Sequence, residues 1–219
     1  MRLSDLIFPR RCKLCGKVID EGAVCTVCSQ KLKQLVSVRQ KTVYTDWGSV
    51  ECRYVFDYEN PIVKRLLFAL KKNGNRDLYE YAATLYCTAL PESFCGAVTS
   101  IPRRKTNVRY YGSDQVKEPC KIMCNRCGVS YENLVARRGF SKDQKMLDVY
   151  ARQKNARGKF RIIKKDIPEN ILLVDDVITT ASTVKSVINE LRSKRPDVKI
   201  TVLCLASQHG SSGNGKLEY

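Results

Sequence analysis

One segment near the C-terminal end, residues 171–183, constrains the fold of this chain more than any other feature. It begins with four apolar residues, Ile171 to Val174, a pattern typical of a strand buried on both faces of a parallel sheet. Two carboxylates, Asp175 and Asp176, follow directly. A hydroxyl-rich loop and then an amphipathic helix come next. A buried strand that leads straight into a helix predicts an α/β fold with a parallel sheet.

The loop of this segment has the chemistry of a binding site for a phosphorylated sugar. The N-terminus of the following helix offers free N–H groups and the positive end of the helix dipole. Asp175 and Asp176 stand where they can accept hydrogen bonds from sugar hydroxyls or help to hold hydrated Mg²⁺. An ordinary turn with a threonine cap explains the helix start but not the two adjacent carboxylates. The predicted phosphate-binding loop residues are Thr179, Thr180, Ala181, Ser182 and Thr183.

Two Cys-x-x-Cys pairs near the N-terminus predict a metal site. Cys12 and Cys15 form the first pair, and Cys25 and Cys28 form the second. Each pair places two thiolates on a tight turn, so we interpret the two pairs as one structural, tetrahedral Zn²⁺ site. Four thiolates leave no open position for a catalytic water, which assigns the site to folding or docking. A redox pair and four unrelated core cysteines are the alternatives.

Other features near and beyond these pairs give further expectations. Short strands are predicted at 17–19 and 23–24, followed by a helix that Ser29 caps. His209, the only histidine, stands beside a Gly/Ser-rich tail and is not expected to act as a catalytic base. The remaining cysteines lie in apolar patterns and are expected to be buried, because cysteine behaves as a small apolar residue. They are Cys52, Cys87, Cys95, Cys120, Cys124, Cys127 and Cys204.

Charge is distributed unevenly along the chain. The net charge is +17; residues 101–165 hold eighteen basic and five acidic residues, and residues 1–41 hold nine and three. Such blocks favour a polyanionic partner, either nucleic acid or a phosphorylated small molecule, over a basic surface kept for solubility. No apolar stretch approaches the ~20 residues of a membrane span, and the first residues lack the apolar core of a secretory signal. We therefore expect a soluble, cytoplasmic protein.

The coarse layout alternates helices with strands, which is typical of a doubly wound parallel sheet. Helices are predicted at 61–72, 77–90, 114–127 and 182–194, and strands at 96–101, 170–176 and 199–206. A β-hairpin-like connector that contains Trp47 and Tyr54 covers about 42–58.

The segment 171–183 resembles the phosphoribosyl-pyrophosphate (PRPP) signature of type I phosphoribosyltransferases, in which two acidic residues precede Thr-Thr-Gly-x-Thr. Nearly the whole chain resembles the competence protein F (ComF) family. The chain departs from the family pattern at Tyr111, where the family has a basic residue, and at Ala181, which replaces the glycine of Thr-Thr-Gly. The motifs that carry the resemblance are Ile7-Phe8-Pro9, residues 58–74, 96–102 and 111–115, Arg137-Arg138 through Gln144, Arg152-x-x-Asn155, and Phe160.

The resemblance implies a phosphoribosyltransferase-type parallel sheet at 41–209, between a zinc ribbon at 1–40 and a flexible tail at 210–219. It implies that PRPP binds with Mg²⁺, that Arg103, Arg104 and Lys105 face the pyrophosphate, and that Arg103 is catalytic together with the two aspartates. Transfer from PRPP passes through a transition state like an oxocarbenium ion, and the departing pyrophosphate needs cations.

Two functions remain open at this point. ComF-like proteins are associated with the import of transforming DNA as single strands, so the resemblance implies a role in DNA uptake, with competence-machinery proteins docking on the ribbon. The alternative is an active phosphoribosyltransferase of nucleotide salvage, with a base or an amine as acceptor. The basic block, with Tyr110, Tyr111 and Tyr131 interleaved, suits single-stranded DNA, although core packing also explains the tyrosines. The residues assigned to nucleic acid are Arg137, Arg138, Arg152 and Lys154.

Overall fold

The computed structural model describes residues 9–138 and 159–208. Within these ranges the chain is a mixed α/β protein whose main sheet has six strands in the order β1-β2-β8-β7-β3-β4. All neighbouring strands from β2 to β4 are parallel, and only the β1–β2 hairpin is antiparallel. The strands are β1 (Arg39–Thr45), β2 (Gly48–Asp57), β3 (Ala97–Ser100), β4 (Ser130–Tyr131), β7 (Asn170–Ile178) and β8 (Lys199–Ser207).

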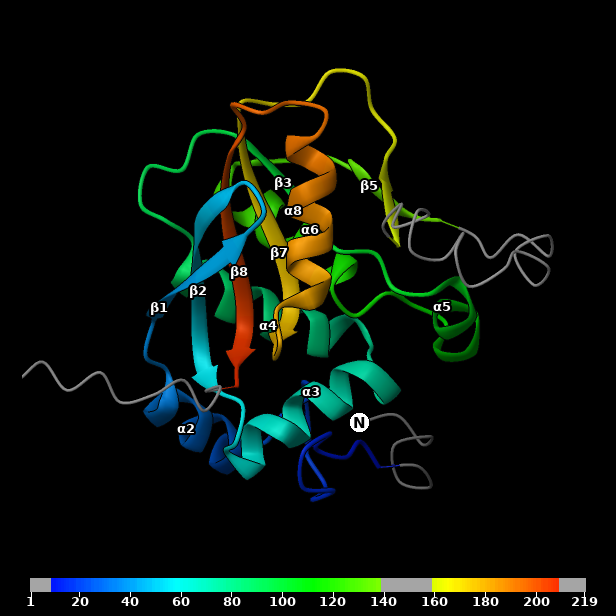
Figure 1. Cartoon of the computed structure of the whole chain (residues 1–219). Coiled ribbons are helices and arrows are strands. Elements are labelled where there is room, and N and C mark those ends of the chain that lie inside the picture. Colours follow the sequence, from blue (N-terminus) through cyan, green and yellow to red (C-terminus); the bar gives the residue numbers. More distant parts are fainter. Residues whose placement is uncertain (1–8, 139–158, 209–219) are drawn as a thin grey trace, which may run out of the picture.

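Helices cover both faces of this sheet, as a doubly wound fold requires (Figure 1). Helix α8 (Ser182–Arg192) lies on one face, and α4 (Arg76–Ala89) and α6 (Lys117–Cys127) lie on the other. Helix α3 (Pro61–Asn73) and helix α2 (Thr26–Leu35) lie beyond the carboxyl ends of the strands. A short helix α5 (Lys105–Tyr111) and a separate antiparallel pair, β5 (Val135–Arg137) and β6 (Phe160–Ile162), lie at one side.

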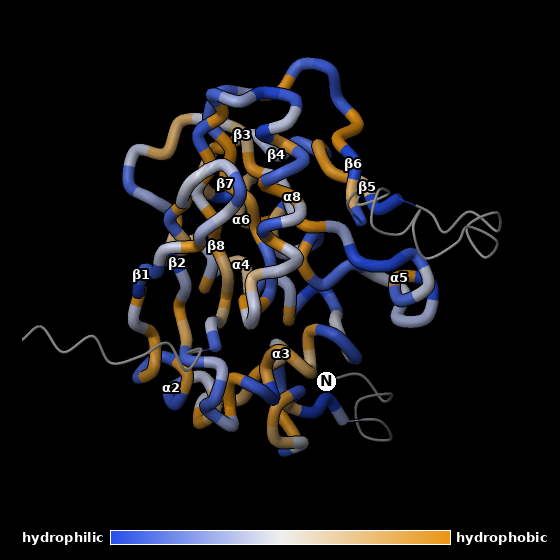
Figure 2. Tube along the Cα trace, in the orientation of Figure 1, coloured by the Kyte–Doolittle hydropathy of each residue, from blue (hydrophilic) through white to orange (hydrophobic). Residues whose placement is uncertain are grey.

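Strand β7 explains why the apolar run of the sequence is continuous rather than alternating. Leu172 and Val174 belong to the core on the α4/α6 face, whereas Ile171 and Leu173 belong to the core on the α8 face. All four side chains are at most 1% exposed, and Figure 2 shows the hydrophobic path of the strand through the centre. Full burial of each such side chain contributes roughly 1.5–3 kcal/mol of hydrophobic free energy, so this strand anchors both layers.

Most of the predicted elements are confirmed within two residues. The exception is the helix predicted at 114–127, which begins only at Lys117. Asp114 precedes it, and its Oδ1 accepts hydrogen bonds from the N–H groups of Val116 (3.0 Å) and Lys117 (3.1 Å). The sequence also missed α5, because a helix of seven residues with no buried side chain has no apolar periodicity to detect.

The N-terminal ribbon packs directly on the α/β domain. Leu14, Cys28 and Leu32 are buried in the same apolar cluster as Leu66 of α3. Helix α2 begins at Thr26, and its N-cap is Cys25, whose Sγ accepts a hydrogen bond from the N–H of Cys28; the predicted cap at Ser29 is therefore wrong. Of the short strands expected between the cysteine pairs, the structure has one isolated bridge, between Arg11 and Val18.

The other cysteines are mostly in the core, as expected. Cys52, Cys120, Cys124 and Cys204 are buried, and Cys87 and Cys127 are half-buried with their Sγ atoms 3.2 Å apart. Cys95 is exposed, which corrects the prediction, since it lies in the loop before β3 rather than in the strand itself. Among the helices that the structure describes, none is long and apolar enough to cross a membrane.

Candidate functional site

A cavity of about 610 Å³ opens at the carboxyl ends of β3 and β7, and we call it the carboxylate cavity. Strand β7 contributes Asp175 and Asp176, and the loop after β3 contributes Arg103 and Arg104. Ligand sites of open α/β sheets lie at this edge, because the loops and helix N-termini converge there. The polar lining also includes two lysines of α3, a tyrosine before it, a glutamine before α6, Asn107 of α5 and Arg137 of β5: Lys64, Lys71, Tyr58, Gln115, Asn107 and Arg137.

The structure brings most of the predicted site residues together in this cavity. Thr179 and Thr183 line it with the aspartates and with both arginines, whereas Thr180 and Ala181 of the loop and Ser182 at the start of α8 do not line the cavity. Lys105 does not line the carboxylate cavity; it lines a neighbouring one, beneath α5. Arg103 lines both cavities.

The two carboxylates are held by their own backbone. The Oδ1 atom of Asp175 accepts a hydrogen bond from the N–H of Asp176 (2.9 Å), and Oδ1 of Asp176 accepts one from the N–H of Val177 (2.8 Å). Gln115, which is only 5% exposed, donates from Nε2 to Oδ2 of Asp176. Burial and then the adjacent Asp176 charge raise the pKa of Asp175 well above its usual range, against the opposing effect of Arg137.

Helix α8 begins in a conformation that favours anion binding. Its N-cap, Ala181, has φ 59° and ψ 4°, in the left-handed region, and no side chain caps the helix. The first hydrogen bond of the helix runs from the N–H of Lys185 to the carbonyl of Ala181 (2.8 Å). The N–H groups of the first turn precede this bond and are left for another partner, at the positive end of the helix dipole.

Arg103 is held in place through its backbone and its side-chain packing. Its N–H donates to Oδ2 of Asp114 (3.3 Å), and its guanidinium lies over the ring of Tyr111 at 5.4 Å. Nη1 of Arg103 is buried and has no hydrogen-bond partner among the residues that the structure describes. Lys72 of α3 also lies over the Tyr111 ring, at 5.4 Å. The ring of Tyr111 therefore holds two cations beside the cavity.

Of the residues assigned to nucleic acid, the structure describes Arg137 and Arg138, and both have contacts within the protein. Arg137 donates from Nε to the carbonyl of Pro102 (2.7 Å), packs on the ring of Phe160 at 4.6 Å and lines both cavities. Arg138 forms an ion pair with Glu190 of α8 (2.9 Å). Arg152 and Lys154 lie outside the described residues, as do His209 and the predicted tail at 210–219.

The three tyrosines of the basic block have different environments. Tyr110 is 79% exposed, whereas Tyr111 contacts it edge-on and lies beneath Arg103. Tyr131 is half-buried and hydrogen-bonded to Ser100 through its hydroxyl (2.8 Å), and burial raises its pKa to about 12. Among the three, only Tyr110 is placed as an open stacking platform.

The four cysteines of the ribbon converge on one point. Their Sγ atoms all lie within 4.8 Å of one another, and those of Cys15 and Cys25 are 3.7 Å apart. In a tetrahedral site with Zn–S bonds of about 2.3 Å, the sulfurs are about 3.8 Å apart, so the cluster fits one Zn²⁺ ion. Gly16, at φ 77°, follows the first pair in the left-handed turn that brings its two sulfurs together. The N-terminal module is thus a four-cysteine zinc ribbon.

Comparison with known proteins gives a match to the N-terminal module. Residues 3–39 match a family model described as "Double zinc ribbon domain". No curated protein matches the chain. Together with the sheet and its helices, this match defines the chain as a mixed α/β protein that carries an N-terminal zinc ribbon.

Among solved structures, the chain is similar to several phosphoribosyltransferases. A glutamine PRPP amidotransferase from B. subtilis, complexed with ADP and GMP, is 14% identical, with a TM-score of 0.46 over 74% of this chain. This chain spans only 35% of that protein. An orotate phosphoribosyltransferase from Aeropyrum pernix is 18% identical, with a TM-score of 0.39 over 86% of this chain and 85% of that one. An adenine phosphoribosyltransferase from Saccharomyces cerevisiae is 16% identical, with a TM-score of 0.30 over 83% and 90% of the two chains.

Proposed function

We propose that the carboxylate cavity binds PRPP together with Mg²⁺. One observation carries this proposal: the adjacent Asp175 and Asp176, the uncapped N-terminus of α8, and Arg103 with Arg104 all meet in a single cavity. In this arrangement the first turn of α8, with Thr179 and Thr183, holds the 5-phosphate. The aspartates accept hydrogen bonds from the ribose hydroxyls, and the arginines face the pyrophosphate.

The same arrangement suits glycosyl transfer from PRPP. When the bond to pyrophosphate breaks, negative charge grows on the leaving group and positive charge grows on the ribose. Arg103 stabilises the negative charge on the leaving pyrophosphate, and the carboxylates of Asp175 and Asp176 stabilise the positive charge on the ribose. Mg²⁺, when bound, neutralises pyrophosphate oxygens, and carboxylate oxygens are ligands that it prefers.

We further propose that PRPP binding serves the handling of single-stranded DNA in natural transformation. One exposed ring and several cations line the carboxylate cavity, and a second exposed ring lies on α5, the helix whose Asn107 also lines it. Exposed rings with cations are the combination that single strands require. Phe68 of α3 is 58% exposed and Tyr110 of α5 is 79% exposed. Lys72 lies over the ring of Phe68 at 5.6 Å. The role places the protein in the cytoplasm, and Val18 and Val27 of the ribbon, both more than half exposed, offer an apolar contact for competence proteins.

Calorimetry with PRPP and Mg²⁺ tests the site directly. We expect wild-type protein to bind and the double variant Asp175→Ala, Asp176→Ala to lose most of the heat. Glu92→Ala removes an exposed carboxylate that lines neither cavity, so it serves as the control and should bind like wild type. Absence of heat with the wild-type protein would refute PRPP binding.

The DNA role has its own test. Affinity for a single-stranded oligonucleotide should fall as salt rises, with a slope of about −0.7 for each phosphate neutralised. Tyr110→Ala should weaken binding, whereas Lys194→Ala, a charge removed from the end of α8, should change it little. Affinity that is absent at low salt contradicts the DNA role. Release of pyrophosphate from PRPP with one of a panel of bases and amines, without DNA affinity, would instead identify a salvage enzyme.

A further inference from the structure

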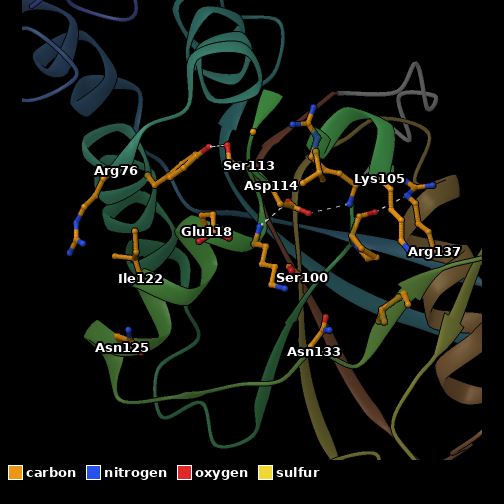
Figure 3. Close-up of a pocket in the computed structure, with 18 of the residues that line it drawn as sticks. Arg76, Ser100, Lys105, Ser113, Asp114, Glu118, Ile122, Asn125, Asn133 and Arg137 are labelled. Carbon is orange, nitrogen blue, oxygen red and sulfur yellow. Dashed lines mark hydrogen bonds between the residues drawn. The ribbon is translucent and has the colours of Figure 1, made fainter. Parts of the chain in front are cut away.

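A second cavity, of about 870 Å³, lies beside the carboxylate cavity, between α5, α6 and β5. We call it the α5–α6 cavity. Figure 3 shows Arg76, Ile122 and Asn125 on one side of it and Lys105 and Arg137 on the other. Its size is within the usual range of small-molecule sites, and neither Asp175 nor Asp176 lines it. PRPP bound as proposed would therefore leave this cavity unfilled.

The lining of the α5–α6 cavity is strongly cationic. Six basic residues line it, against the two acidic residues Asp114 and Glu118. The carboxylate oxygens of Asp114 already accept backbone N–H bonds from the start of α6 and from Arg103. An anion is thus the ligand that this surface attracts. The six basic residues are Arg76, Arg103, Lys105, Lys117, Arg137 and Arg161.

The rest of the lining suits a flat heterocycle. Val108 and Ile122, both partly exposed, offer apolar contact for the faces of a ring. Asn125 and Asn133, both exposed side-chain amides, offer donors and acceptors for its edge. Phosphate and heterocycle together make a nucleotide, and a simple inorganic anion would use only part of this lining.

Arg103 and Arg137 form the wall between the two cavities. The buried Nη1 of Arg103, which lacks a partner among the described residues, faces an energetic cost that a ligand phosphate would remove. Phosphates on the two sides of this guanidinium would share its single positive charge, and the two like charges would repel each other across it. The occupancy of one cavity must therefore affect the affinity of the other.

We propose that the α5–α6 cavity binds a nucleoside monophosphate, either free or as a residue of a single strand, and that this nucleotide competes with PRPP for Arg103. The competition rests on the proposed PRPP site, whereas the nucleotide site itself does not. The phosphate lies toward Arg103 and Arg137, and the base lies toward Ile122 and Asn125.

Direct titration with AMP, without PRPP, tests the nucleotide site. We expect Arg161→Ala to weaken AMP binding about tenfold, the usual effect of one lost charge-assisted hydrogen bond, and to leave PRPP binding as it is. Arg109→Ala removes the same charge from α5 outside both cavities and should leave AMP binding unchanged. Arg76→Ala is a second variant that should weaken AMP binding. The Arg76 side chain is 88% exposed, so its removal should not disturb folding.

The carboxylate cavity is the competing location for AMP, and the double variant Asp175→Ala, Asp176→Ala distinguishes the two. We expect this variant to keep its affinity for AMP while it loses PRPP. The proposal would be overturned if the double variant lost AMP binding while Arg161→Ala bound AMP like wild type. It would also be overturned if the wild-type protein did not bind AMP. AMP binding by a protein that does not bind PRPP would refute the proposed function and the competition but leave the nucleotide site in place.

Two further titrations test competition and identify the source of the nucleotide. With AMP at about three times its wild-type Kd, the apparent Kd for PRPP should rise several-fold in wild type and much less in Arg161→Ala. An unchanged Kd in wild type would refute the sharing of Arg103. Displacement of AMP by a twelve-residue oligo-dT would assign the site to a nucleotide within a strand; persistence of bound AMP would assign it to a free nucleotide.

Discussion

Replacing Ala181 by glycine is the sharpest available test of the phosphate-binding loop. Ala181 is the N-cap of α8, and it has a left-handed backbone, at φ 59° and ψ 4°. In this conformation the Cβ atom of an L-residue lies too close to the following carbonyl oxygen, and glycine, which has no Cβ, adopts it freely. The substitution supplies the residue that this backbone conformation favours.

The expected gain in stability is the difference between two contributions. The left-handed conformation costs a non-glycine residue roughly 1–2 kcal/mol. Glycine makes the unfolded chain more flexible, which takes back about 0.4–1 kcal/mol. We therefore expect Ala181→Gly to raise the free energy of unfolding by about 0.5–1 kcal/mol. For a chain of this size, the rise in Tm is about 1–4 °C.

Ser93→Gly provides a matched comparison for this measurement. Ser93 is the other non-glycine residue with positive φ, at 56°, among those that the structure describes, and it lies in an exposed loop away from both cavities. Urea unfolding should show a similar gain for both variants. Only Ala181→Gly should also tighten PRPP binding, because the backbone can then approach the phosphate more closely. A loss of about 1 kcal/mol in Ala181→Gly, the ordinary cost of glycine near a helix end, would refute the left-handed cap.

Three other predictions concern the support of the site. Asp114→Ala removes acceptors from the start of α6 and from Arg103, so it should cost about 1–2 kcal/mol in urea unfolding and weaken PRPP binding, while Asp114→Asn should restore part of both. Removal of zinc by a chelator should speed hydrogen exchange in α3 as well as in the ribbon, because Leu32 and Leu66 share one core; exchange confined to the ribbon would contradict this coupling. Asp175→Asn should increase stability, because burial raises the folded-state pKa of Asp175. In wild type, the free energy of unfolding falls as the pH rises above the unfolded-state pKa of Asp175, which is about 4. The difference in free energy of unfolding between Asp175→Asn and wild type should therefore grow from about pH 4 upward. A difference that stays constant with pH would count against the burial of this carboxyl.

The sequence was sufficient to predict the central strands of the sheet because they are apolar on both faces, whereas the two-residue strand β4 carries no such pattern and was missed. Residues 171–174 could only be buried from two sides, and the helix after them had a clear apolar face at Val184, Val187, Ile188 and Leu191. The cysteine pairs were equally informative, since their spacing requires thiolates on two tight turns. Both features are local patterns, which is why the strand and helix at 170–194 were located within two residues and the four cysteine ligands were identified, although the cap and short strands expected in the ribbon were wrong.

The parts that the sequence could not supply depend on contacts between distant segments. Gln115 is uncharged and carries no pattern, yet it reaches Asp176, which is 61 residues away. Lys105 was grouped with Arg103 and Arg104 because they are adjacent, but α5 begins there and carries Lys105 to the other cavity. Arg138 looked available to nucleic acid until the fold placed Glu190 beside it. Composition identifies that charges are present, and only the fold decides which of them already have partners.

The positive charge of residues 101–138 shows how the fold sorts such a block. Arg126 forms an ion pair with Glu80, and Arg138 forms one with Glu190, so both charges are balanced within the protein. Five of the other seven basic residues line one or both cavities, because the loop after β3, the start of α6 and strand β5 converge on the carboxyl edge of the sheet. Cations that serve only solubility need not converge on the carboxylate cavity and the α5–α6 cavity. The proposed phosphate ligands on both sides of Arg103 explain this convergence better. The five residues are Arg103, Arg104, Lys105, Lys117 and Arg137.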